Sequence, residues 1–152
     1  MKQNGFKHIS TKDGVATLQG DFAGYKDCII GISTLTQKDL VHKIGVLFPD
    51  KETWSTLYDN YFNLKEMLTE KYGEPSNVVE KFDNRSSESQ DDNTKMYEVK
   101  FDRCKYYSIW ETEKGKIQLS IGHHSVTSCF VKLAYFDKIN NATIKKQALD
   151  EL

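Results

Sequence analysis

The chain has 152 residues, of which 28% are charged and 12% aromatic, and its formal net charge is −1. This balance excludes wholesale disorder, and no apolar run approaches the roughly 18 residues that a membrane-spanning helix needs. Only Arg85 and Arg103 among the 21 basic residues are arginine, so the sequence offers no guanidinium cluster for phosphates or bases. We therefore expect a single domain over residues 1–152 that binds no nucleic acid and does not span a membrane.

The first residues are unusual for the start of a domain. Gly5 followed by Phe6 is typical of a helix C-terminus that leads into a strand. One interpretation is that an N-terminal helix, with or without a signal peptide, is missing; the other is a short frayed tail. A truncated chain would be periplasmic or secreted, whereas a chain that naturally starts at Met1 would be cytoplasmic.

Residues 15–48 have the pattern of an antiparallel meander of three strands. Strands are expected over 15–22, 27–33 and 40–48, separated by short polar or glycine-containing breaks. In each of the last two strands, alternate residues form one apolar face, which includes Ile30 in the first of them and Val46 in the second.

The strongest helix signal covers Lys51–Tyr72. Asp50 can cap its N-terminus, and Gly73 followed by Pro75 ends it. Apolar residues recur at spacings of three and four and form one stripe that could lie across the sheet. The stripe consists of Trp54, Leu57, Tyr58, Tyr61, Leu64, Leu68 and Tyr72.

The region after this helix begins with a strand and a polar stretch. Residues 76–82 are expected to form a strand, with two valines at its centre. Residues 83–95 contain no apolar side chain and are expected to form an exposed loop, and residues 96–101 have no clear assignment.

Three strands and a closing helix complete the prediction. The strands cover 105–112, 116–123 and 129–136, and the helix starts at Asn140 or Asn141 and ends at Leu152. The expected fold is therefore α+β, in the order β-β-β-α-β-loop-β-β-β-α. We expect two layers, a mostly antiparallel sheet with the long central helix and the C-terminal helix packed on one face.

The three cysteines show no metal-binding or redox spacing. Cys28 and Cys129 lie in apolar strand patterns, where a free cysteine acts as a small buried hydrophobe, and a bridge between them requires neighbouring strands. Cys104 lies between Arg103 and Lys105, whose charges could lower the pKa of its thiol.

A histidine pair is the densest group of possible metal ligands. His123 and His124 precede Cys129, and adjacent strand residues point to opposite faces, so at most one histidine joins the cysteine. A structural zinc site needs four such ligands and a catalytic site three. We therefore predict no metal and no other cofactor.

Motifs for nucleophilic or nucleotide chemistry are absent from the sequence, so we do not expect an enzyme. Tyr106 and Trp110 share one face of a predicted strand with Ser108; exposed, this aromatic row would suit a glycan, a peptide or a protein. The alternative is that the row forms a core layer. The preferred function is a non-catalytic binding or protein-interaction module, and homo-oligomers are compatible with it. The alternative function is a thiol- or metal-dependent protein that uses Cys104 or the His124/Cys129 region.

Three segments resemble a known group of proteins. They are residues 64–75, which end in Lys-Tyr-Gly-Glu-Pro, residues 109–119 with their Trp-containing strand and hairpin, and residues 131–137, Val-Lys-Leu-Ala-Tyr-Phe-Asp. Together they are similar to small uncharacterised α+β proteins of Gram-negative bacteria, many of which lie in the envelope. The resemblance implies a two-layer fold and an unknown function, and it carries no catalytic residue over to this chain.

Overall fold

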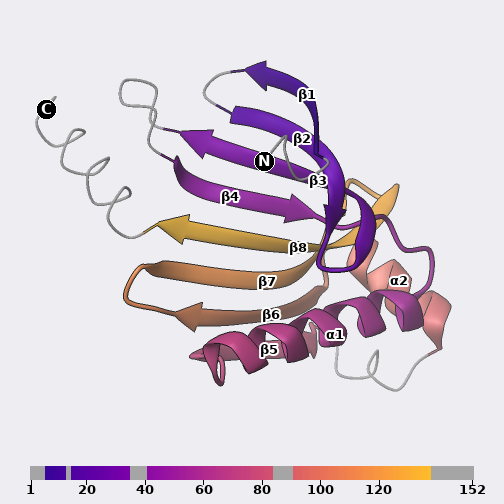
Figure 1. Ribbon diagram of the computed structural model, residues 1–152. Coiled ribbons are helices and arrows are strands. Elements are labelled where there is room, and N and C mark those ends of the chain that lie inside the picture. Colours follow the sequence, from indigo (N-terminus) through magenta and orange to yellow (C-terminus); the bar gives the residue numbers. More distant parts are fainter. Residues whose placement is uncertain (1–5, 13–14, 35–40, 84–90, 138–152) are drawn as a thin grey trace, which may run out of the picture.

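The computed structural model describes residues 6–12, 15–34, 41–83 and 91–137 (Figure 1). Within these ranges the chain forms strands and helices in the following order. They are β1 (Lys7–Lys12), β2 (Val15–Phe22), β3 (Tyr25–Thr34), β4 (Val41–Leu47), α1 (Trp54–Tyr72), β5 (Asn77–Phe82), α2 (Asp92–Lys100), β6 (Cys104–Glu111), β7 (Gly115–His124) and β8 (Ser128–Asp137).

The strands form one antiparallel sheet in the order β1-β2-β3-β4-β8-β7-β6-β5. Two meanders, one before α1 and one after it, meet in the middle of this sheet, where β4 pairs with β8 and Val46 lies opposite Leu133. The last described strand thus closes the gap between the two halves, as Figure 1 shows. The expectation of a mostly antiparallel sheet combined with helices is confirmed.

Both described helices contact each other and also contact β7 and β8. They cover one face of the sheet, with α1 running along the half that contains β5, β6 and β7 (Figure 1). The core forms between this helical layer and the strand residues that alternate toward it. Its most buried side chains include Ile30, Val46, Phe48, Leu57, Tyr61, Leu64, Trp110, Leu119 and Val131.

Helix α1 begins three residues later than the sequence predicts. Thr53 rather than Asp50 is the N-cap, and its hydroxyl accepts a hydrogen bond from the backbone N–H of Thr56 at 3.3 Å. A carboxylate from the other helix also caps this end, because Asp92 of α2 accepts hydrogen bonds from the backbone N–H groups of Trp54 and Ser55. These bonds pair donors that the first turn of a helix leaves without intrahelical partners.

Two elements correct the predicted order. Of the loop expected at 83–95, residues 84–90 lie outside the described residues. From Asp91 onward the loop prediction is wrong, because the Asp91 side chain accepts a hydrogen bond from the backbone N–H of Thr94 at 2.8 Å and caps helix α2. Residues 96–101, left unassigned by the sequence, continue that helix to Lys100 and bury Met96 and Val99. Strand β1 was not expected; every residue in it is exposed, so it shows no apolar alternation.

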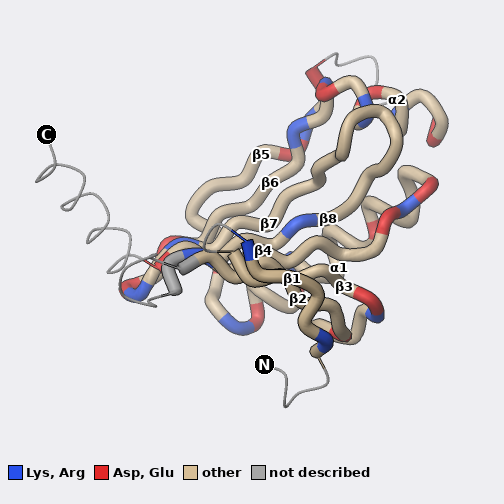
Figure 2. The backbone as a smooth tube through the Cα atoms, turned by 90° about the horizontal axis from the view of Figure 1, so that it is seen from above, with Lys and Arg blue, Asp and Glu red and all other residues tan. Residues whose placement is uncertain are grey.

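The expected C-terminal helix from Asn140 or Asn141 to Leu152 lies outside the described residues. Within the described ranges, no helix has the length and hydropathy to cross a membrane. Residues of both charge signs are distributed around the chain (Figure 2), in keeping with the net charge of −1.

Candidate ligand-binding site

An apolar cavity of about 400 Å³ lies between α1 and the sheet. We call it the α1 cavity. Its sheet wall consists of Ile30 from β3, Ile44 and Val46 from β4, Ile117 from β7, and Leu133 and Tyr135 from β8. Phe22 and Ala23, at the turn between β2 and β3, also line the cavity. The cavity therefore spans the junction between the two meanders.

The helical wall comes from the second half of α1. It consists of Leu64, Met67, Leu68, Lys71 and Tyr72, which recur at helical spacing. The first half of the same helix packs closely on β5 and β6, where Trp54 meets Phe82 and Tyr106 at ring-centroid distances of 5.0 and 5.2 Å. One helix thus closes the core at its N-terminal end and leaves a cavity at its C-terminal end.

The walls of the cavity change in exposure from one end to the other. Ile30, Val46 and Leu64 are buried, whereas Met67 and Tyr72 are 46% and 40% exposed. Lys71 is also exposed, and its ammonium lies 5.3 Å from the centroid of the Tyr72 ring. A cavity of this volume and lining is typical of sites for small organic molecules.

A polar side chain without a hydrogen bond lies one helical turn from the cavity. Asn60 precedes Leu64 by four residues in α1 and is only 3% exposed. Neither its Nδ2 nor its Oδ1 has a hydrogen-bond partner among the described residues. Most buried amides are paired, so Asn60 is an exception that costs stability in this arrangement.

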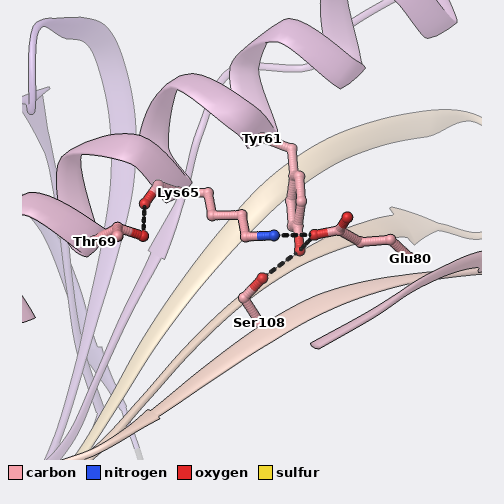
Figure 3. A network of polar contacts seen from close by, with 5 residues as sticks. All are labelled: Tyr61, Lys65, Thr69, Glu80 and Ser108. Carbon is pink, nitrogen blue, oxygen red and sulfur yellow. Dashed lines mark hydrogen bonds and ion pairs between the residues drawn. The ribbon is translucent and has the colours of Figure 1, made fainter. Parts of the chain in front are cut away.

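Next to this cavity, a polar network joins α1 to strands β5 and β6 (Figure 3). The Tyr61 hydroxyl lies 2.7 Å from the Ser108 Oγ and donates to the Glu80 carboxylate at 3.4 Å. Lys65 forms an ion pair with the same carboxylate, and the Thr69 hydroxyl donates to the backbone carbonyl of Lys65 at 2.7 Å.

The network has the properties of a structural element. Burial raises the pKa of the Tyr61 phenol well above its usual value, and the nearby Glu80 carboxylate raises it further, while the Ser108 hydrogen bond opposes this shift. A tyrosine that keeps its proton so firmly is a poor general base or nucleophile near neutral pH. The hydroxyl instead satisfies buried Ser108 and fixes α1 against the sheet.

The structure places the two predicted aromatic site residues on the helix-facing side of β6. Trp110 is 1% exposed, and its indole N–H donates to the Gly73 carbonyl at 2.8 Å. Tyr106 is half-buried and makes edge-on ring contacts with Trp54 and Tyr61. Ligand binding by Tyr106 and Trp110 stays a prediction, and it would require the helical layer above them to move.

The described cysteines are all unpaired. Cys28 in β3 and Cys129 in β8 are separated by β4, so the neighbouring strands that a disulfide needs are not present. Burial raises the pKa of the Cys104 thiol to about 12, with the nearby Asp83 carboxylate acting in the same direction. This shift is opposite to the lowering of the thiol pKa considered for Arg103 and Lys105. Lys105 follows Cys104 in the strand and therefore points to the other face, and Arg103 lies before the strand.

The histidine pair is divided between the two faces of the sheet. His123 lies opposite Cys129 in the β7–β8 register, and its Nδ1 is 2.7 Å from the Ser125 carbonyl oxygen. His124 lies opposite Ser128 and is exposed. In the part of the chain that the structure describes, no group of three histidine, cysteine or acidic side chains is placed to hold a metal ion.

Comparison of the chain with protein-family models, curated protein sequences and solved structures found no match. The feature of the described structure that suggests a function is therefore the α1 cavity. Sequence reasoning missed it because its walls come from six separate elements, α1 and the strands β2, β3, β4, β7 and β8. The one signal in the sequence was the apolar stripe of α1, which is longer than the part of the helix that the sheet covers tightly.

Proposed function

We propose that this protein is a non-catalytic binding protein that holds a small apolar ligand in the α1 cavity. The observation that carries the proposal is the cavity itself, about 400 Å³ of space beside a helix whose other half is closely packed. Apolar contacts provide the binding free energy, at roughly 25 cal/mol for each Å² of ligand surface removed from water.

The lining supports binding rather than chemistry. Its side chains are aliphatic or aromatic except for Lys71 at the exposed end. The cavity is open at the end formed by Met67 and Tyr72, so a ligand that enters it removes apolar wall surface from water. We therefore expect ligand binding to raise the melting temperature.

The experiment is a titration with Nile red, an uncharged dye that fluoresces in apolar surroundings. Two variants add an indole to α1 at different positions. Leu68→Trp fills the cavity, whereas Asn63→Trp places the same group at an exposed position that does not line it. We expect the wild type and Asn63→Trp to bind the dye and Leu68→Trp to lose it, with circular dichroism confirming that all three are folded.

Competition with dodecanol completes the test. Displacement of Nile red by this uncharged chain, together with a higher melting temperature, would support the proposal. Equal dye binding by the wild type and Leu68→Trp, or no binding by the wild type, would reject the α1 cavity as the site.

The compartment forms a separate part of the proposal. Residues 64–75, 109–119 and 131–137 resemble small uncharacterised proteins of Gram-negative bacteria, many of which lie in the envelope, and this supports a location there. The N-terminus of the mature protein, sequenced from separated envelope and cytosolic fractions, tests this part. A chain found only in the cytosol would reject it and leave the binding proposal standing.

A further inference from the structure

We propose that the ligand of the α1 cavity is a single-chain amphiphile with a carboxylate head group, which lies beside Lys71 while the chain extends toward Ile30 and Val46. This inference rests on the proposed function and adds the chemical class and the orientation of the ligand.

The first argument is the polarity of the two ends of the cavity. The inner walls are aliphatic, and Ile30, Val46 and Leu64 are almost completely buried. A polar group placed there would lose its water without gaining a partner, which is costly. The exposed end, formed by Met67, Lys71 and Tyr72, keeps a head group in contact with water.

The second argument is the charge at the exposed end. Lys71 is the one charged side chain among those that line the cavity. The ion pairs found between described residues use Lys65, Arg103, Lys105 and His123 as the cationic partner, and Lys71 is not among them. The Lys71 ammonium lies 5.3 Å from the centroid of the Tyr72 ring, and Tyr72 is an exposed residue that also lines the cavity.

The third argument is hydrogen-bonding chemistry. An ammonium group offers three donors and no acceptor, so it complements a head group that is an acceptor and carries negative charge. A carboxylate meets both requirements, an alcohol meets only the first, and an alkylammonium meets neither. Ligands with the same chain and these three head groups therefore separate the charge effect from the apolar effect.

The experiment measures Kd for dodecanoate, dodecanol and dodecylammonium by calorimetry below their aggregation concentrations. Dodecanoate is expected to bind most tightly and dodecylammonium most weakly. Lys71→Met should weaken dodecanoate about fivefold, the scale of an exposed ion pair, and leave dodecanol unchanged. Lys81→Met is the matched control, because Lys81 is exposed on β5 and does not line the cavity; it should change neither Kd.

The outcomes distinguish this inference from the proposed function. If dodecanol and dodecanoate bind equally and Lys71→Met alters neither, the cavity binds apolar chains and the head-group assignment is wrong. A fivefold loss for dodecanoate in Lys81→Met as well as in Lys71→Met would also overturn it, since the charge effect would then be general. Failure of all three ligands and of Nile red would reject the proposed function itself.

Discussion

The carboxylate of Asp92 accepts hydrogen bonds from the backbone N–H of Trp54 at 2.8 Å and from that of Ser55 at 2.7 Å. The first residue of α2 thus caps the N-terminus of α1, although 38 residues separate Asp92 from Trp54. A carboxylate at this position also interacts favourably with the positive end of the helix dipole. These two hydrogen bonds therefore hold the N-terminus of α2 against the N-terminus of α1.

Replacing Asp92 with alanine should lower the free energy of unfolding by about 1–2 kcal/mol, the usual cost of losing an N-cap side chain. Urea denaturation followed by circular dichroism measures this. Glu66→Ala, at an exposed position of α1, is the control and should have little effect. An Asp92→Ala variant as stable as the control would mean that Thr53 alone suffices as the cap.

The hydrogen bond between Tyr61 and Ser108 can be measured with a double-mutant cycle. Tyr61→Phe should cost about 1–3 kcal/mol because it leaves the buried Ser108 hydroxyl without its partner. The double variant Tyr61→Phe/Ser108→Ala should cost less than the sum of the single changes. Additive losses would show that the two groups do not interact. Tyr61→Ala, which also removes the ring, should cost roughly 3–5 kcal/mol.

The raised pKa of Tyr61 predicts a loss of stability in alkali. In the folded state the Tyr61 phenol keeps its proton above its usual pKa of 10.0, whereas in the unfolded chain it loses the proton there. As the pH rises past about 10, the release of this proton in the unfolded chain lowers the free energy of unfolding. Below that pH, Tyr61 contributes no pH dependence to the free energy of unfolding. Denaturation between pH 9 and about 11 should show a steeper decline for the wild type than for Tyr61→Phe. An equal decline in the stability of both proteins over this pH range would contradict the raised pKa of Tyr61.

Asn60 offers a stabilising substitution. Leucine has a similar size, and Asn60→Leu removes two buried polar atoms that lack hydrogen bonds, so the free energy of unfolding should rise by about 1–3 kcal/mol. Asn63→Leu, at an exposed position of α1, controls for helix propensity. A destabilised Asn60→Leu variant would indicate that the amide has a partner in solution, such as an internal water.

The raised pKa of Cys104 predicts slow alkylation of the folded protein. With a pKa of about 12, its thiolate fraction at pH 8 is about a thousandfold lower than that of an unperturbed cysteine thiol with a pKa of 9.0. Mass spectrometry after iodoacetamide treatment should find Cys104 unmodified in the native protein and modified in urea. Rapid native labelling would revive the thiol-dependent alternative.

Some elements could be read from local pattern because their residues carry the period of the structure that they form. The stripe from Trp54 to Leu68 repeats every three or four residues, and α1 buries Trp54, Leu57, Tyr61 and Leu64 along it. Strand β7 alternates every second residue, with Ile117 and Leu119 buried. Helix α2 was missed because its few buried side chains are surrounded by polar ones, and β1 because an exposed edge strand has no buried face.

The sequence by itself therefore determined the long helix, most strands and their inward faces, since these depend on residues close together in the chain. Only the tertiary structure decided that β8 pairs with β4, that Asp92 caps α1 and that Trp110 lies under the helical layer. The existence and position of the α1 cavity also depend on the tertiary structure. Such features depend on distant segments meeting at particular distances, and many pairings of the same strands satisfy the same local pattern equally well.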